Sequence, residues 1–309
     1  MDSPMKKSKQ SKNNRSKKHH YLPRKYLRGF VNNQSCFFVY DKQNDKILPR
    51  PLSPDATFFE NNLNTVIFPN GEASDFLEKL YTEFENQSWG PLDTIRNSNN
   101  KTPIQLLDKM HLFLFLLFLH WRLPSNIKHV DELSEKFFGK DNNLNYFTLK
   151  SKSGGSVPQE IAEKIKNSSA FKKSSRLMLP FAPFYTNNWS ERLNKDWRFL
   201  YTGDGNNWYL VGDNPIITKG DNDHDPINCL NEFVFPISGK ILLISKRINR
   251  DLSPEFVIQY NISIIERAQR FVACPNKDFL EALIKNYKVY VQFGKTTSII
   301  PEMFDMIKA

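Results

Sequence analysis

The most constraining feature of this sequence is an unbroken apolar run from Leu112 to Leu119, within HLFLFLLFLHW. Eight apolar residues are too few to cross a membrane, which takes about 20, and Asp108 and Lys109 lie just upstream. The stretch 102–105 carries a capping threonine, a proline at the first helical position and a glutamine at the capping-box position. We therefore predict a buried central helix that starts near Thr102 and ends before Pro124.

The remaining pattern predicts an α+β domain around this helix. CFFVYDKQNDKILPR is typical of a hairpin, and SDFLEKLYTEFENQSW of a further helix. The second half has strand character in WYLVG, PIITKG, NEFVFPIS and GKILLISK, then helical character in NISIIERAQRFVAC and DFLEALIKNY and a last strand in KVYVQF. We predict one domain over 19–309, with an N-terminal hairpin, buried central helices and a C-terminal antiparallel sheet with late helices. Residues 137–175, rich in Lys, Ser, Asn and Gly, are expected to form a loop-rich insertion.

The positive charge is concentrated at the N-terminus. The chain has a formal net charge of +10, and residues 1–28 hold ten Lys or Arg and a single acid, Asp2. Residues 1–18 are polar without an apolar period, so we predict a disordered basic tail. The cysteines, Cys36, Cys229 and Cys274, are far apart and have no zinc-ligand spacing, which favours a reducing cytoplasm. We expect no membrane partner.

The segment KKHHYLPRKYLRGF, residues 17–30, joins the tail to the domain. His20 is a candidate general base because the ordinary pKa of histidine lies near 6.5. Interleaved cations and aromatics suit phosphate contact and base stacking, and the candidate nucleic-acid-binding residues are Lys17, Lys18, Arg24, Tyr26 and Arg28. The alternative is a short segment that buries Tyr26, Leu27 and Phe30 while its cations stay in solvent.

Further candidates lie in the helices and in one turn. Glu85 is flanked by aromatics, and partial burial would raise its pKa. Arg122 leaves an apolar helix and needs a partner, for which a buried carboxylate is the first candidate. Asp213 and Asn214, in the turn GDNP between apolar strands, could hold a metal or a water. A solvated helix face and ordinary turn chemistry are the alternatives.

Several motifs are absent from the sequence. It has no phosphate-cradling glycine loop, no GxGxxG, no GxSxG and no HExxH. Nucleotide-driven motors, dinucleotide oxidoreductases and α/β-hydrolases are therefore disfavoured.

Over residues 19–280 the chain resembles the bacterial family catalogued as domain of unknown function 4238. The family's HHYVPR-type opening, helical E…iE segment, R-T-P and SDNP turn are similar to His19–Arg24, Glu78–Glu85, Arg122–Pro124 and Gly212–Pro215. Gly212 stands where serine is usual, and Leu123 where threonine is usual. The resemblance implies no reaction, but it groups the candidate catalytic residues His20, Arg24, Glu85, Arg122, Asp213 and Asn214.

Three functions stay open from the sequence. In a nuclease-type phosphodiesterase, used as an effector in bacterial anti-phage defence, His20 would be the base or a ligand, and Glu85 and Asp213 acid–base partners or ligands of a divalent metal. Arg24 and Arg122 would stabilise phosphate charge. A non-catalytic module would bind nucleic acid through the basic tail. An interaction component would bind a protein partner and keep its polar residues as an internal network.

Overall fold

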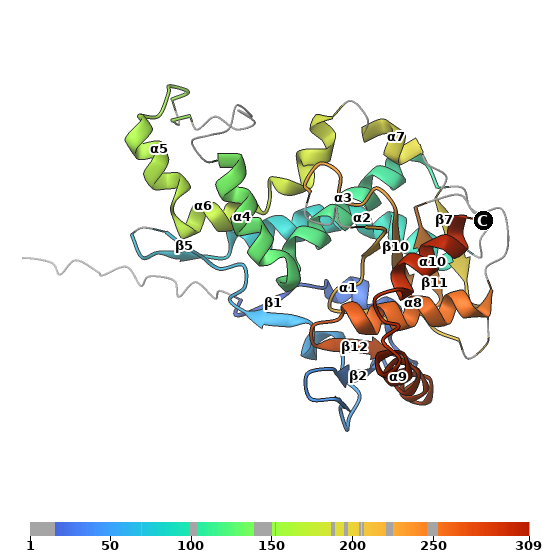
Figure 1. Cartoon of the computed structure of the whole chain (residues 1–309). Coiled ribbons are helices and arrows are strands. Elements are labelled where there is room, and N and C mark those ends of the chain that lie inside the picture. The colour runs from blue at the N-terminus through green and yellow to red at the C-terminus, as the bar shows by residue number, and fades with distance from the viewer. Residues whose placement is uncertain are drawn as a thin grey trace, which may run out of the picture.

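The computed structural model describes residues 16–68, 70–98, 104–138, 150–151, 153–186, 189–194, 197–203, 205, 207–220, 225–245 and 253–308 (Figure 1). Most of the predicted disordered tail, residues 1–15, lies outside this part of the chain. Ordered pairing starts before the predicted boundary at residue 19. The Lys17 carbonyl accepts a hydrogen bond from the Asn62 amide at 2.8 Å, and β1 (Lys18–His20) pairs antiparallel with β4 (Phe59–Asn61).

The predicted N-terminal hairpin is confirmed as β2 (Phe38–Asp41) and β3 (Lys46–Ile47). It belongs to a four-stranded antiparallel sheet of order β3-β2-β12-β8. The inner strand β12 (Phe271–Cys274) comes from near the end of the chain, and β8 is Val211–Gly212. The hairpin therefore pairs with a strand, β12, that lies more than 200 positions away, and this pairing joins the two halves of the sequence in one sheet.

The second sheet contains most of the predicted C-terminal strands. Its order is β7-β11-β10-β9, all antiparallel, with bounds Arg198–Tyr201 for β7, Ile241–Ile244 for β11, Phe233–Ser238 for β10 and Ile217–Thr218 for β9. Every residue of β10 and β11 is buried. These strands lie inside the core because their sequences are apolar on both faces.

The central helix is confirmed as α3 (Leu106–Arg122), whose residues from Leu112 onward are buried with the exception of Leu114. It packs along α2 (Phe76–Asn97). The helix starts at Leu106, and the predicted cap at Thr102 lies outside the described residues. No described helix has both the length and the apolar character that a membrane span requires.

The predicted loop-rich insertion contains two short helices, α5 (Gln159–Lys166) and α6 (Ser169–Ser175). The Ser168 hydroxyl caps α6 by accepting a hydrogen bond from the Phe171 amide at 3.2 Å. Residues 139–149, which follow α4 (Ile127–Phe138), lie outside the described part of the chain. The remaining short elements are β5 (Val66–Ile67), β6 (Ala73–Ser74) and α7 (Trp189–Asn194).

Two predictions for the C-terminal region are wrong. The segment Phe271–Cys274 was expected to continue a helix but forms β12, because α8 (Pro254–Arg267) ends at Ala268 and the chain then turns into the sheet. KVYVQF was expected to be a strand, but α9 (Lys277–Gln292) continues through it. Val289 and Val291 are about half exposed at the end of α9, and the buried part of this helix is made by earlier residues. A last helix, α10 (Ile299–Lys308), packs on α8.

Candidate functional site

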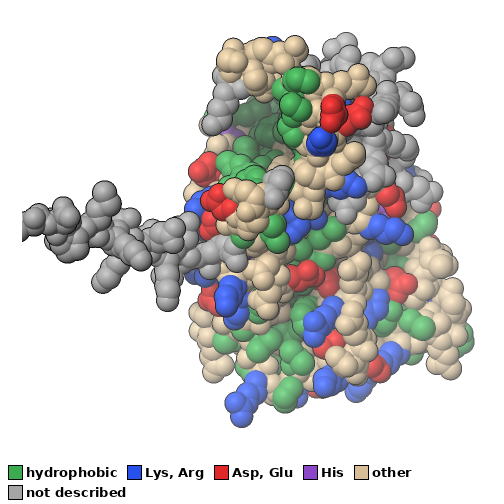
Figure 2. Space-filling model, turned by 90° about the vertical axis from the view of Figure 1, so that its left-hand side faces the viewer, with side chains coloured by type: hydrophobic (Ala, Val, Ile, Leu, Met, Phe, Trp, Pro, Cys, Tyr) green, Lys and Arg blue, Asp and Glu red, His purple; other side chains and the backbone are tan. Residues whose placement is uncertain are grey.

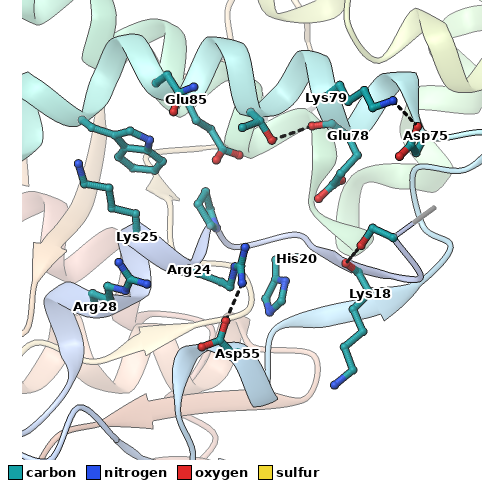
Figure 3. Close-up of a pocket in the computed structure, with 15 residues that line it drawn as sticks. Lys18, His20, Arg24, Lys25, Arg28, Asp55, Asp75, Glu78, Lys79 and Glu85 are labelled. Atoms are coloured by element: carbon teal, nitrogen blue, oxygen red, sulfur yellow. Dashed lines mark hydrogen bonds and ion pairs between the residues drawn. The ribbon is translucent and has the colours of Figure 1, made fainter. Parts of the chain in front are cut away.

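A charged cleft of about 760 Å³ lies between the segment β1–α1 and the exposed face of α2 (Figure 3). Helix α1 is the single turn Arg24–Leu27. The α2 residues that line the cleft recur every three or four positions, so they share one face of the helix. We call this site the His20 cleft, and its lining residues are Ser16, Lys18, His20, Pro23, Arg24, Lys25, Arg28, Asp55, Asp75, Glu78, Lys79, Thr82, Glu85, Asn86 and Trp89.

His20 is the one histidine in the cleft wall. Its ring packs on Phe59 of the paired strand with centroids 5.4 Å apart, and its Nε2 is withdrawn from solvent without a hydrogen-bond partner among the described residues. Burial lowers the pKa of His20, and the charge of Arg24 lowers it further, while Asp55 and Glu78 oppose this shift. The ring is therefore neutral near pH 7 and can accept a proton.

His19 has a structural role instead. It is completely buried, its Nδ1 accepts the Asn64 amide at 2.8 Å, and its Nε2 lies 3.0 Å from the Ser16 carbonyl. With Nδ1 accepting, Nε2 carries the proton and donates to that carbonyl. Successive residues of a strand face opposite sides, so β1 buries one histidine and presents the other to the cleft.

The cations of the cleft differ in their pairing. Arg24 donates to the Asp55 carboxylate at 2.8 Å, and both side chains are exposed. This hydrogen bond lowers the pKa of Asp55. The Arg28 side chain is exposed and forms no hydrogen bond or ion pair with any residue that the structure describes. Lys18 lies over the Phe59 ring at 4.6 Å from its centroid. Figure 3 shows Arg28, Arg24 and Lys18 spread along the β1–α1 wall, with Glu78 and Glu85 opposite.

The predicted carboxylate partner of Arg122 is confirmed as Glu85. The Arg122 Nη1 donates to Glu85 Oε1, and its Nε donates to the Tyr21 carbonyl at 2.8 Å. Arg122 is buried and lies behind the cleft wall, with its guanidinium over the Tyr81 ring. Burial raises the pKa of Glu85, and the charge of Arg122 opposes this rise. Arg122 therefore positions Glu85 and the backbone next to His20, and it does not line the cleft as a phosphate contact would.

Asp213 is not part of the cleft. Its carboxylate accepts the backbone amides of Gln269 at 2.9 Å, Arg270 at 2.7 Å and Phe271 at 2.9 Å. Burial raises its pKa, while these hydrogen bonds oppose the rise. It lies in a separate cavity of about 190 Å³. The half-buried Asn214 lines neither cavity. The predicted grouping of both residues with His20 is wrong because Asp213 is used to hold the turn between α8 and β12.

Tyr26 is also misassigned as a nucleic-acid contact. Its ring is completely buried, its hydroxyl donates to the Pro236 carbonyl at 2.8 Å, and it stacks on Phe235 with centroids 5.2 Å apart. The alternative interpretation is confirmed: Tyr26, Leu27 and Phe30 anchor the segment while its cations face outward. Lys17 is exposed but does not line the cleft.

Most of the polar and aromatic residues that line the cleft were not among the predicted site residues, and Trp89, Asn86 and Asp55 are three of them. Trp89 and Asn86 follow Glu85 on the face of α2, and their helical spacing from Glu78 is the signal that would have found them. Asp55 lies in a short 3-10 turn, Pro54–Ala56. Only the fold brings it to Arg24.

The predicted metal ligands are not assembled. His20 and Glu85 line the cleft, whereas Asp213 is consumed by backbone amides elsewhere. Among the described residues, no group of three or more His, Cys, Asp or Glu side chains is placed to hold a metal ion.

Together these features define an α+β protein whose two halves share one sheet and whose charged cleft combines a neutral histidine, arginines and helix-borne carboxylates. The chain belongs to the family described as "Protein of unknown function (DUF4238)", whose model matches residues 18–278. No curated protein and no solved structure matches the chain. The matched region starts at β1 and ends just beyond β12, so it contains the whole shared sheet and all but one of the residues that line the cleft.

Proposed function

We propose that the His20 cleft is the active site of a nuclease-type phosphodiesterase. The observation that supports this most is that His20, with an unpartnered ring nitrogen, shares one cleft with Arg24, Arg28 and two carboxylates of α2. A buried nitrogen without a partner costs free energy. The ring has to turn toward the cleft for this nitrogen to meet a bound reactant, because Nε2 is withdrawn from solvent in this structure.

In the proposed reaction His20 acts as the general base. It takes the proton of an attacking hydroxyl or water as the new oxygen–phosphorus bond forms. Arg24 and Arg28 stabilise the charge on the phosphate oxygens. The phosphorus–oxygen bond to the leaving group then breaks, and the leaving oxygen takes a proton from solvent water.

The free cysteines bear on the compartment in which the protein acts. Cys36, Cys229 and Cys274 form no disulfide, and free thiols persist in reducing compartments. We propose on this basis that the protein acts in the cytoplasm. Its use as an effector in anti-phage defence stays a prediction.

A non-catalytic nucleic-acid-binding module is the second candidate. Among the residues that the structure describes, the exposed side chains of Arg28, which is unpaired, and of Lys18 in the same cleft favour it. It shares the binding surface but needs no proton transfer. It therefore predicts that replacing His20 changes affinity at most modestly and that no cleavage occurs.

The test incubates the full chain with labelled single-stranded and duplex DNA and RNA in Mg²⁺, in Mn²⁺ and in chelator. We expect cleavage of at least one substrate, and a loss of about 10²- to 10⁴-fold in rate for His20→Ala, as removal of a general base gives. Cleavage of none of them, or an undiminished rate in His20→Ala, would show that the proposal is wrong.

A further inference from the structure

The end of the cleft nearest Trp89 has the chemistry of a nucleotide-base site. We propose that it binds an unpaired nucleotide of a single-stranded nucleic acid, with the base stacked on Trp89 beside Asn86 and the adjoining phosphate between Arg28 and Arg24. This inference rests on the proposed function, because it names the substrate class of the same cleft.

Trp89 is a fixed aromatic surface in the cleft wall. It is half-buried and packs edge-to-face on Phe115 of α3, with centroids 5.6 Å apart. The Lys25 ammonium lies 5.5 Å from the centroid of its ring and is held there by Asp93 at 2.9 Å. A part-buried indole in the wall of a basic cleft is the usual platform for stacking a base, which each nucleobase can do irrespective of sequence. A base that stacks on Trp89 shares the ring with the Lys25 ammonium or displaces it.

Asn86 provides hydrogen-bonding groups next to this platform. It is exposed and lies three residues before Trp89 on the same face of α2, and its side chain forms no hydrogen bond with any described residue. A side-chain amide has both a donor and an acceptor, which is the combination that pairs with the edge of a base. Base edges of a duplex are already paired, so this site selects single strands.

The order of the cations along the cleft matches the positions of base and phosphate in a bound nucleotide. Lys25 and Arg28 lie at one end of the cleft, Arg24 and His20 in the middle, and Lys18 toward the other end (Figure 3). A phosphate at Arg28 and Arg24 would therefore lie between the base site and His20. The cleft volume, about 760 Å³, falls in the range of about 300–1,000 Å³ for small-ligand pockets. One or two nucleotides fit such a volume, whereas a duplex does not.

We also considered the apolar groove formed by Phe68, Ile161, Ile165 and Phe171 beside α5 and α6. Figure 2 shows hydrophobic side chains around a hollow on the face that carries these helices. Nothing in the described chain indicates which partner or segment would cover this groove.

The test measures binding of a short single-stranded oligonucleotide, of an abasic chain with the same number of phosphates, and of a duplex. The full chain carries His20→Gln so that cleavage does not consume the ligand, and one salt concentration in chelator is used throughout. We expect the base-bearing strand to bind at least about tenfold more tightly than the abasic chain, as one stacked base provides. We expect the duplex to bind no better than the abasic chain.

Variants then locate the base. Trp89→Ala should reduce the preference for bases to within about twofold of unity, and Trp89→Phe should retain most of it. Asn86→Ala, an exposed change, should reduce the preference less than Trp89→Ala does. Trp189→Ala removes an exposed tryptophan on α7 and should leave the preference unchanged.

Equal binding of the base-bearing and abasic chains to the His20→Gln chain overturns the inference even if no tryptophan variant folds. A preference that persists in folded Trp89→Ala does the same. Base-dependent binding without cleavage by the wild-type chain overturns the proposed enzyme and leaves the base site standing. Cleavage by the wild-type chain without base-dependent binding overturns the base site and leaves the proposed enzyme standing.

Discussion

At the scale of single residues, His19 and His20 show how position decides between structure and chemistry. Both have the same side chain, but the alternation of β1 buries His19, whose two ring nitrogens are occupied, and presents His20 to the cleft. The sequence identified the pair and favoured His20. The pairing of β1 with β4, about 40 residues away, is what gives this choice its physical reason.

The pH dependence of activity follows from the lowered pKa of His20. The base must be neutral, so kcat/KM should fall on the acid side with a midpoint below 6.5, the ordinary value for histidine. A pH–rate profile of the wild-type chain measures it. An acid limb with its midpoint above 6.5 would contradict the assignment.

The same pKa shift has a consequence for folding. Because the unfolded chain takes up a proton on His20 at a higher pH than the folded chain, this residue makes the protein less stable as pH falls through 6.5. His20→Gln should remove that part of the pH dependence. Urea titrations of wild type and variant at pH 7.5 and 5.5 compare the two, and identical pH dependence would contradict it.

Arg122 and Glu85 form the buried pair on which the α2 wall depends. Arg122→Ala leaves the Glu85 carboxylate without its partner and should lower the free energy of unfolding by about 3–5 kcal/mol. The double variant Arg122→Met with Glu85→Leu should recover part of this loss, because an apolar pair needs no charge compensation. Chemical denaturation measures both. A loss below about 1 kcal/mol for Arg122→Ala would show that the pair is not structural.

The role of a single residue could be predicted from the sequence where its partners are close to it in sequence. Trp89 lies on the helical face that already included Glu78 and Glu85, so the sequence contained the information to find it. The role of Asp213 could not be predicted from the sequence, because the three backbone amides that its carboxylate binds belong to residues 269–271. A turn with a free aspartate and a turn with a capped one look alike in sequence.

At the scale of elements, the junction of α1, α2 and β10 is held by Arg96. Its guanidinium donates to the carbonyls of Lys25, Tyr26 and Ile237. Gly29 lies against it, and a Cβ at this position would come within 2.4 Å of the Arg96 Nη2. The glycine is therefore needed for the close approach of the arginine to the backbone of the cleft wall.

Gly29→Ala should displace this guanidinium and destabilise the protein by about 1–3 kcal/mol, the usual effect of overpacking. Gly90→Ala is the matched control, since an added Cβ there meets nothing within 4 Å and alanine is the better helix former. Thermal or urea unfolding of both variants checks this. Equal stability of Gly29→Ala and wild type would contradict it.

The elements that were predicted correctly are those with strong local patterns, such as the apolar run of α3 and the turn of the first hairpin. The end of α8 could not be predicted because it depends on a residue distant in sequence. The Asp213 carboxylate accepts the backbone amides of the turn that follows α8 and leads into β12. The strand expected in KVYVQF is wrong because valines two positions apart also occur at the exposed end of a helix. Local pattern does not show which tertiary contacts are available.

At the scale of the whole molecule, the sheet β3-β2-β12-β8 joins residues 38–47 to residues 211–274. The α+β class was predictable from the element pattern. The interleaving was not, because strands distant in sequence pair only when the intervening chain has folded. The hairpin, the cleft and the late helices therefore form one unit.

The charge distribution leads to a prediction for the whole chain. Residues 1–15 carry five cations, Lys6, Lys7, Lys9, Lys12 and Arg15. If nucleic acid is the partner, deleting these residues should make log affinity less dependent on log salt, by about 0.7 for each single-strand phosphate that the tail neutralises. Fluorescence anisotropy at several salt concentrations measures the slope. An unchanged slope would show that the tail does not bind nucleic acid.

The central claim is that His20 accepts a proton during phosphodiester cleavage. Its most direct test is the single-turnover cleavage rate of His20→Gln at pH 7.5, beside wild type and His129→Gln, a change of a histidine on α4 that does not line the cleft. We predict a rate at least about 100-fold lower for His20→Gln and an unchanged rate for His129→Gln, with both variants folded by circular dichroism. Equal rates for His20→Gln and wild type would contradict the claim.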